Sequence, residues 1–198
     1  VCMNERRKWQ ILREDKVYET NWLSVHDYDV IAPTGHQGVY GKVHIKQFAI
    51  GVLPVDENGF TYLVGQERFC FDQYSWELPE GGGKFTDPPL ETARRELAEE
   101  TNLAAKHFIP IFSNAHFSNS MTDEIGYAFL AHDLYETSGK PDETEDISLR
   151  HLPLKEVFSM ANQGQITDLF TLAVLWRAYH LAHTGGLPAD IASHFRDI

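Results

Sequence analysis

The first part of the chain is a series of short apolar and aromatic runs separated by turn-forming residues. Short runs rich in Val, Ile, Tyr, Phe and Trp are typical of β-strands. We expect strands at residues 9–12, 17–20, 22–31, 39–45, 48–54, 60–67 and 74–78. Turn signals lie at Pro33-Thr34-Gly35 and at Asp56-Glu57-Asn58-Gly59, and the second predicts a hairpin.

Apolar residues at helical spacing begin only after the glycine run at residues 81–83. We expect helices at 89–101, at 154–163 with its end near Gly164, and from Thr167 or Asp168 to about residue 183. The last helix is expected to bury Leu169, Leu172, Ala173, Leu175 and Trp176. Further strands are expected at 108–112, 125–130 and 147–152, and an acidic loop at 135–146. Strands before and after one central helix predict an α/β fold, an α/β/α sandwich with a mixed sheet.

The strand-rich start of the chain suggests a division into two parts. We interpret residues 1–46 as an N-terminal antiparallel β-strand unit and residues 47–198 as the main domain. A few strands alone are too small to bury a core. The unit therefore predicts a homodimer, in which these strands pack on a second copy of the chain.

Composition narrows the possible partners. The chain has 198 residues and a formal net charge of −12, which argues against binding to nucleic-acid backbone or to anionic membranes. Cys2 and Cys70 have no metal-type spacing and fit a reducing compartment. Neither a targeting peptide nor an apolar run long enough for a membrane helix is visible. We expect a cytoplasmic protein.

The candidate chemistry lies in the helix predicted after the glycine run. Glu96, Glu99 and Glu100 share one face of it, because successive helical residues are rotated by about 100°. Like charges at this spacing repel one another, and a divalent cation would relieve the repulsion. Hard cations such as Mg²⁺ take carboxylate oxygens and keep phosphate oxygens as further ligands. The pattern indicates metal-assisted attack on a phosphate ester or anhydride.

An alternative is that this helix face is a solvated, salt-bridged surface. Arg95 is spaced to pair with Glu91 on one side and with Glu99 on the other. We interpret Arg95 as structural support that aims Glu99, rather than as a substrate ligand.

The segment from Gly81 to Leu103 resembles the Nudix box, G-x5-E-x7-R-E-U-x-E-E-x-G-U, in which U is aliphatic. The matching positions are Gly81, Arg95, Glu96, Leu97, Glu99, Glu100 and Leu103. The resemblance implies the Nudix fold and a divalent metal, Mg²⁺ with Mn²⁺ possible, held by Glu96, Glu99, Glu100 and the Gly81 carbonyl. Asp87 stands where the family has Glu, and Asn102 where it has Gly. We expect Asp87 to support the site and to cap the helix, and Asn102 to end the helix in a left-handed conformation.

The remaining segments resemble the Nudix branch of ADP-ribose and nucleoside-diphosphate-sugar pyrophosphatases. They lie at residues 9–12, 17–22, 64–69, 76–81, 142–147 and 164–168. The resemblance implies cleavage of a nucleoside diphosphate sugar to a nucleoside monophosphate and a sugar phosphate, by a homodimer whose N-terminal strands help to form the partner's base pocket.

Several residues are candidates for the other roles at the site. A base that accepts a proton from the attacking water must lie within hydrogen-bond reach of it, and Glu143, Glu145 and Glu124 are the candidates. For the substrate we expect Arg68 to bind a phosphate, Glu77 to bind a sugar hydroxyl, and Trp22 or Tyr18 to stack on the base. The ordinary alternative is that these residues have no functional role. In that case the glutamates are simply exposed, and the other side chains fill the core or the surface.

Two other functions remain open. Hydrolysis of nucleoside triphosphates or dinucleoside polyphosphates would use the same metal site. A non-catalytic nucleotide-sensing Nudix module would be expected to lack metal-binding glutamates, which are all present here.

Overall fold

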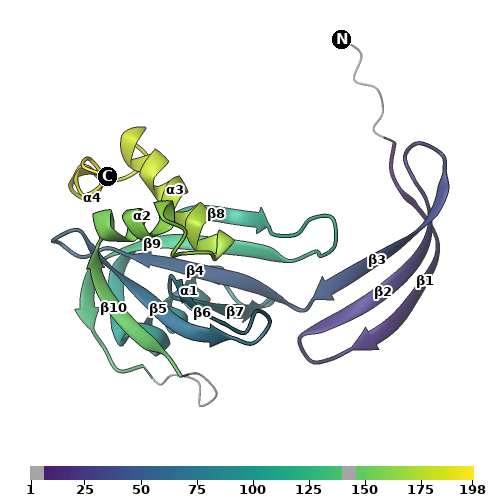
Figure 1. Ribbon diagram of the computed structural model, residues 1–198, viewed down its shortest axis with the longest axis horizontal. Coiled ribbons are helices and arrows are strands. Elements are labelled where there is room, and N and C mark those ends of the chain that lie inside the picture. Colours follow the sequence, from purple (N-terminus) through teal and green to yellow (C-terminus); the bar gives the residue numbers. More distant parts are fainter. Residues whose placement is uncertain (1–6, 140–145) are drawn as a thin grey trace, which may run out of the picture. The chain divides into compact units, whose positions relative to one another are not determined.

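The computed structural model describes residues 7–139 and 146–198. Its described residues form two compact units (Figure 1). We call residues 7–47 together with 116–125 the N-terminal unit, and the remaining residues from 48 onwards the main unit. This division adds residues 116–125 to the N-terminal unit, whereas the sequence places them in the main domain.

The N-terminal unit is built on a three-stranded antiparallel sheet in the order β1-β2-β3. The strands are β1 (Gln10–Glu19), β2 (Leu23–Ile31) and β3 (Gln37–Ile45). The strands expected at 9–12 and 17–20 are therefore one strand, with register shifts between Ile11 and Arg13 and between Lys16 and Tyr18. The polar middle of β1 continues the strand because the Arg13 guanidinium pairs across the sheet with Asp29, at 2.6 Å.

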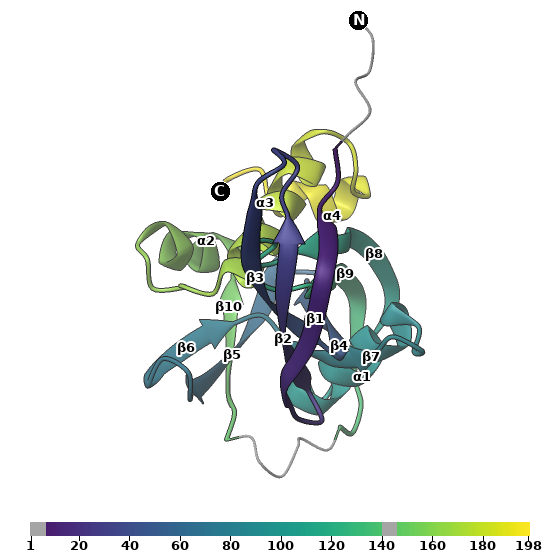
Figure 2. The same ribbon diagram turned by 90° about the vertical axis from the view of Figure 1, so that its right-hand side faces the viewer.

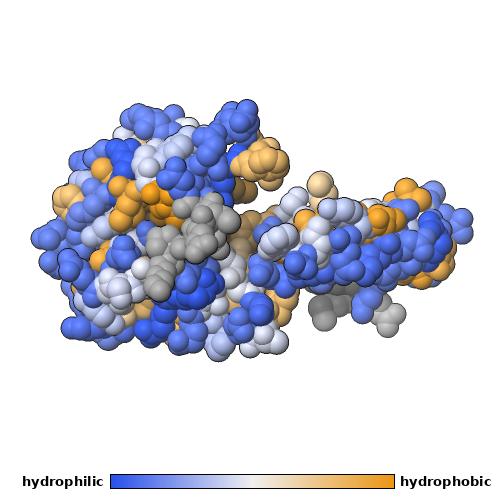
Figure 3. Space-filling model, turned by 90° about the horizontal axis from the view of Figure 1, so that it is seen from below, coloured by the Kyte–Doolittle hydropathy of each residue, from blue (hydrophilic) through white to orange (hydrophobic). Residues whose placement is uncertain are grey.

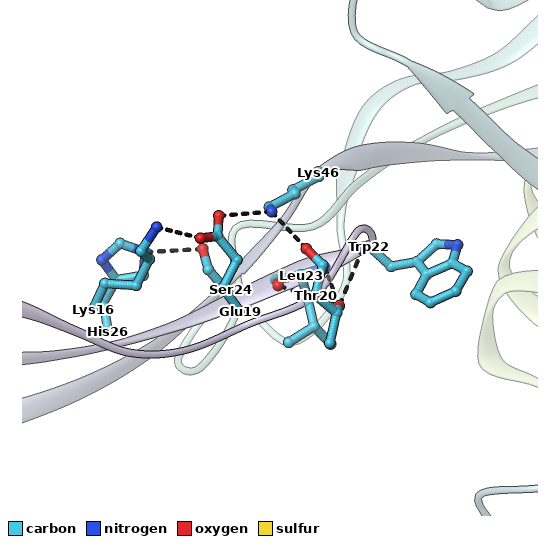
Figure 4. Close-up of polar contacts among 8 residues, drawn as sticks. All are labelled: Lys16, Glu19, Thr20, Trp22, Leu23, Ser24, His26 and Lys46. Carbon is cyan, nitrogen blue, oxygen red and sulfur yellow. Dashed lines mark hydrogen bonds and ion pairs between the residues drawn. The ribbon is translucent and has the colours of Figure 1, made fainter.

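The turn from β1 to β2 is fixed by polar contacts (Figure 4). The Thr20 hydroxyl accepts hydrogen bonds from the backbone N–H groups of Trp22 and Leu23, both at 3.2 Å. Lys46 donates to the Thr20 carbonyl at 2.6 Å and to Glu19 at 2.8 Å. The Trp22 indole points away from these contacts and is exposed.

Residues 116–125 attach to β3 of the N-terminal unit. The backbone N–H of Val43 donates to the Met121 carbonyl at 2.8 Å, and that of Asp123 donates to the Val43 carbonyl at 3.3 Å. The Asp123 carboxylate accepts hydrogen bonds from the His44 ring at 2.7 Å and from the Ile45 backbone N–H at 3.0 Å. A segment far along the sequence thus completes this unit.

Two sheets form the centre of the main unit, in the orders β7-β4-β9-β8 and β10-β5-β6. Their strands are β4 (Gln47–Pro54), β5 (Phe60–Arg68), β6 (Gln73–Glu77), β7 (Glu80–Lys84), β8 (Leu103–His116), β9 (Ile125–Glu136) and β10 (Ser148–Pro153). Because β4 and β9 pair in parallel, the larger sheet is mixed, as predicted.

Helices cover the sheets of the main unit. They are α1 (Pro89–Thr101), α2 (Leu154–Asn162), α3 (Leu169–His183) and the short α4 (Ala189–Ser193), which the sequence did not predict. In Figures 1 and 2, α1 lies apart from α2 and α3, with strands of the main unit between them. Gly51 of β4 leaves room for the Phe170 ring of α3, and Gly83 of β7 leaves room for Phe48 and for Thr92 of α1. The predicted α/β sandwich with an added antiparallel unit is confirmed.

The expected burial of α3 is wrong in part. Leu175 is buried, but Leu169 is 73% exposed and Trp176 is 42% exposed. Phe170, Thr171, Val174 and Ala178 are buried instead. The reason lies at the start of the helix, where Asp168 accepts from the Thr171 backbone N–H at 2.6 Å and so turns Phe170 and Thr171 towards the sheets.

Within residues 7–139 and 146–198, no helix has the length and apolar character needed to span a bilayer.

Candidate active site

The glycine run forms β7 and leads directly into α1, which begins at Pro89. The N-cap is Pro88, and its side chain cannot accept a capping hydrogen bond. The expectation that Asp87 caps the helix is therefore wrong, since the helix begins one residue later than a cap at Asp87 requires. The Asp87 carboxylate instead accepts a hydrogen bond from the Thr86 hydroxyl at 3.1 Å.

Two of the three candidate metal ligands on α1 are buried glutamates. Glu96 is 8% exposed and Glu100 is 7% exposed, and the side chain of Glu99 is about one third exposed. Buried carboxylates are rare in proteins unless they are paired or bind a cation. Their burial argues against an ordinary solvated surface on this face of α1.

The glycine run approaches these carboxylates closely. A Cβ atom at Gly81 would collide with the Glu96 carboxylate, so a larger residue there would have to displace the Glu96 side chain. The backbone N–H of Glu80 donates to a Glu100 carboxylate oxygen at 2.9 Å. The glycine run thus places main-chain polar groups beside the acidic face of α1.

Arg95 orients Glu99, the third of the candidate metal ligands. Its guanidinium donates to Glu99 at 2.5 Å, to Glu96 at 2.6 Å and to the Gly82 carbonyl at 2.9 Å. Arg95 and Glu99 are four residues apart in the sequence, and their pairing was expected from this spacing. Arg95 therefore links the glycine run to the acidic face of the helix.

The donor atoms on this face fit a hard divalent cation. Among the described residues, no three acidic, His or Cys side chains converge closely enough to form a ligand set, and Arg95 engages both Glu96 and Glu99. The available groups are carboxylate and main-chain carbonyl oxygens, the ligands that Mg²⁺ and Mn²⁺ prefer. A cation there would share Glu96 and Glu99 with Arg95.

Two of the four residues predicted to bind substrate, Arg68 and Glu77, are paired with each other. The Arg68 Nε atom donates to Glu77 at 2.9 Å, and a second guanidinium nitrogen contacts the other carboxylate oxygen, so the pair is bidentate. This hydrogen-bonded pairing raises the pKa of Arg68 above its ordinary value. Glu77 is 3% exposed, and a buried carboxylate of this kind fixes the direction of the guanidinium.

Glu80, which the sequence did not single out, lies beside Glu100, to which its backbone N–H donates. Its carboxylate accepts a hydrogen bond from the Thr171 hydroxyl at 2.8 Å, and the same hydroxyl accepts from the Leu78 backbone N–H at 2.9 Å. Burial raises the pKa of the Glu80 carboxyl well above its ordinary value, and the charge of Asp168 adds to the effect. The available signal was an acidic residue directly before Gly81.

Asn102 joins the end of α1 to the segment that follows β9. It has φ 56° and ψ 27°, the left-handed conformation predicted from its residue type. Its side-chain oxygen accepts from the Gly139 backbone N–H at 3.0 Å, and its main-chain carbonyl accepts from Thr137 at 2.9 Å. A side chain at Gly139 would collide with the Ala98 carbonyl, so this close approach also requires glycine.

The other predicted site residues lie elsewhere. Glu143 and Glu145 lie outside the described residues. Glu124 belongs to the N-terminal unit, and burial raises the pKa of its carboxyl. Tyr18 and Trp22 also belong to the N-terminal unit, where both are largely exposed.

Comparisons with known proteins agree with this arrangement. The model of the NUDIX domain matches residues 45–170, which is more than half of the chain. The chain is 29% identical over 153 residues to an ADP-ribose pyrophosphatase of Mycobacterium tuberculosis, covering 75% of this chain and 72% of the relative. It is 26% identical over 162 residues to an ADP-ribose pyrophosphatase of Bacillus subtilis, covering 81% and 86%.

A solved structure described as an ADP compounds hydrolase has the same fold. It superposes with a TM-score of 0.83 at 19% identity, covering 92% of this chain and 98% of that chain. The family match, the relatives and the fold all indicate the Nudix family, and so do the glycine run and the acidic face of α1. The chain therefore belongs to the Nudix family and is a Nudix pyrophosphohydrolase of the branch that contains the ADP-ribose pyrophosphatases.

Proposed function

We propose that this enzyme hydrolyses the pyrophosphate bond of nucleoside diphosphate sugars, with ADP-ribose as its leading substrate. The products are a nucleoside monophosphate and a sugar phosphate. The observation that carries the proposal is the acidic face of α1, whose buried Glu96 and Glu100 lie against the glycine run. The two ADP-ribose pyrophosphatases among the relatives support the choice of substrate.

The cofactor is Mg²⁺ or Mn²⁺, held by Glu96, Glu99, Glu100 and the Gly81 carbonyl. When bound, such an ion neutralises charge on the phosphates and lowers the pKa of a bound water. Arg95 keeps Glu99 directed towards the glycine run through its contacts with Glu99 and the Gly82 carbonyl.

Substrate recognition is assigned to Arg68 and Glu77. Glu77 holds the Arg68 guanidinium through two contacts, which leaves other N–H groups of the same guanidinium to bind a phosphate oxygen. Glu77 is also the candidate for binding a sugar hydroxyl. Tyr18 and Trp22 are exposed aromatic side chains suited to stacking on the base.

The base that activates water is one of three carboxylates. Glu143 is our first choice, because it lies in the acidic stretch that resembles the catalytic loop of this branch, and Glu145 shares that stretch. Glu124 is the third candidate. The raised pKa of its carboxyl gives it the greater proton affinity that a base near neutral pH needs.

A substrate panel tests the function. The full chain is incubated with ADP-ribose, an ADP-hexose, a UDP-hexose, a GDP-hexose and ATP, each with Mg²⁺, with Mn²⁺ or with a chelator. We expect equal amounts of nucleoside monophosphate and sugar phosphate from ADP-ribose, and no turnover with the chelator. Hydrolysis of ATP alone would identify the triphosphate alternative. Binding without hydrolysis of any substrate would identify a sensing module.

Matched variants test the acidic face. Glu99→Gln and Glu100→Gln are each expected to lower turnover about a hundredfold or more, because metal-ion catalysis supplies several kcal/mol of transition-state stabilisation. Glu91→Gln on the same helix is the control, since its side chain is 66% exposed. Circular dichroism checks that the helix is retained. Near-normal turnover in both site variants would rule out the metal assignment.

A further inference from the structure

The main unit has a pocket of about 570 Å³ away from the acidic face of α1. It is lined by Leu90 and Arg94 of α1, by residues 106–109 of β8, by His132 of β9 and by Pro188. Arg94 leaves the helix at least about 120° around the axis from each of Glu96, Glu99 and Glu100. The pocket therefore lies on the other side of α1 from the candidate metal ligands.

This pocket gathers basic side chains in a chain whose net charge is −12. Arg94, Lys106, His107 and His132 line it, and none of the described residues that line it is acidic. The acids next to it are Glu91, 3.6 Å from Arg94, and Asp133, 3.4 Å from the His107 ring nitrogen. The described residues form no ion pair with Lys106. Lys106 is therefore the positive charge that is available to an anion.

The side chains of the pocket are held in place by ring contacts. The Arg94 guanidinium lies over the Phe108 ring, 4.8 Å from its centre. Packing on the ring, as well as electrostatic attraction, therefore fixes its position. The rings of His107 and His132 stack with their centres 5.0 Å apart. These contacts give the cationic groups fixed directions, which a set of exposed lysines would lack.

His132 forms part of the wall of the pocket. The residue is 9% exposed, and its buried Nδ1 atom has no hydrogen-bond partner among the described residues. Because that atom is buried from solvent, it is out of reach of an ion in the pocket. The positive charges that attract an anion therefore come from Arg94 and Lys106.

We propose that this basic pocket binds a small phosphate-bearing anion, either inorganic phosphate or a phosphate monoester, at a site separate from the acidic face of α1. The Arg94 fork suits two phosphate oxygens, and Lys106 supplies a point charge. The phosphate group is common to inorganic phosphate, nucleoside monophosphates and sugar phosphates. The site holds the phosphate group, and the rest of a nucleoside monophosphate or sugar phosphate extends out of the pocket.

Calorimetric titration of the full chain without divalent metal tests the proposal. Inorganic phosphate, AMP, ribose 5-phosphate and sulfate are titrated separately at constant ionic strength, so that the arms distinguish the sources of the phosphate group. Omitting the metal keeps binding at the acidic face low. Histidine ring resonances in NMR spectra report where each anion binds, and we expect those of His107 and His132 to shift.

Arg94→Gln and Lys106→Gln give the decisive comparison. Each is expected to weaken phosphate binding about tenfold or more, because a charge-assisted contact is lost. Arg177→Gln, an exposed arginine of α3, removes the same charge elsewhere and is expected to leave binding unchanged. The absence of binding up to millimolar phosphate, or equal binding in all three variants, would overturn the proposal.

Discussion

At the candidate active site, Glu96, Glu99 and Glu100 share one face of α1 but are held in three different ways. Glu100 is held by the Glu80 backbone N–H, Glu99 by Arg95, and Glu96 by both Arg95 and the close backbone of Gly81. Each carboxylate is thus held in place, although the three side chains do not converge into one ligand set among the described residues. A cation would have to draw them together.

The sequence predicted contacts within α1 better than contacts across the fold. The spacing of Arg95 and Glu99, and the residue type of Asn102, are local signals, and the structure shows the pairing and the left-handed conformation. The hydrogen bond from Thr171 to Glu80 joins residues 91 positions apart, which no local pattern can reveal. The Asp87 cap failed because two prolines follow it and the helix begins at the second.

A prediction at the scale of single residues concerns Asn102. Asn102→Gly should leave thermal stability nearly unchanged, because glycine adopts φ 56° without strain. It should speed hydrogen exchange at the Gly139 amide severalfold, since a side-chain hydrogen bond contributes about 1 kcal/mol. Asn102→Ala should speed the same exchange and also lower stability by about 1 kcal/mol, the cost of a left-handed alanine.

Mass-spectrometric or NMR exchange and thermal melts provide the measurements for these two variants. Asn102→Asp is the control, because it retains an oxygen that can accept from Gly139. Unchanged exchange at Gly139 in Asn102→Gly would show that the side chain does not hold this segment. In that case the replacement of the Nudix glycine would concern only the helix end.

At the scale of elements, the helix at Pro89–Thr101 and most strand cores followed from local patterns, whereas lengths and partners did not. β8 begins at Leu103 rather than 108, and β9 extends to Glu136 rather than 130. Pairing between neighbouring strands extends them beyond the residues that favour strands by themselves. Residues 116–125 join the N-terminal unit through backbone hydrogen bonds with Val43 and through the Asp123 side chain, which are long-range contacts with no local signal.

Asp123 gives the prediction for this attachment. Burial by itself would raise the pKa of Asp123, but hydrogen bonds from His44, the Ile45 backbone and Lys42 outweigh it and lower the pKa from 3.8 to about 2. A lowered pKa in the folded state means that the charged form stabilises the fold. The contribution is complete above pH 3.8 and is lost as pH falls towards about 2.

We therefore expect Asp123→Asn to be less stable than the natural chain at pH 7, with the difference shrinking as pH falls from 3.8 to about 2. Thermal melts of both proteins, followed by circular dichroism at each pH, measure this difference. Asp197→Asn, at an exposed site near the end of the chain, is the control and should show no such trend. A stability difference that is constant from pH 7 to pH 2 would argue against an ionic role for Asp123.

At the scale of the whole molecule, the N-terminal unit leaves much apolar surface uncovered. Exposed apolar side chains of this unit include Trp9, Ile11, Leu12, Val17, Tyr18, Trp22, Val39 and Met121. The face shown in Figure 3 carries orange apolar areas among blue hydrophilic ones on this unit. A pocket of about 430 Å³ within it is lined by aromatic residues, among them Trp9, Tyr28 and Tyr40. A soluble monomer seldom exposes apolar surface so densely.

The homodimer predicted from the sequence explains this surface, because a second copy would cover it. We expect the natural chain to sediment at twice its mass of 22.6 kDa. The double variant Ile11→Lys and Val39→Lys, at sites 62% and 75% exposed, should sediment as a monomer, because lysine charges cannot be buried in an apolar interface. Its KM for ADP-ribose should rise more than its kcat falls, as expected for a base pocket to which the partner's strands contribute while α1 remains intact. Leu149→Lys on β10, at a site 43% exposed, is the control and should remain dimeric. A natural chain that is monomeric at micromolar concentration and fully active would contradict both the dimer and the shared pocket.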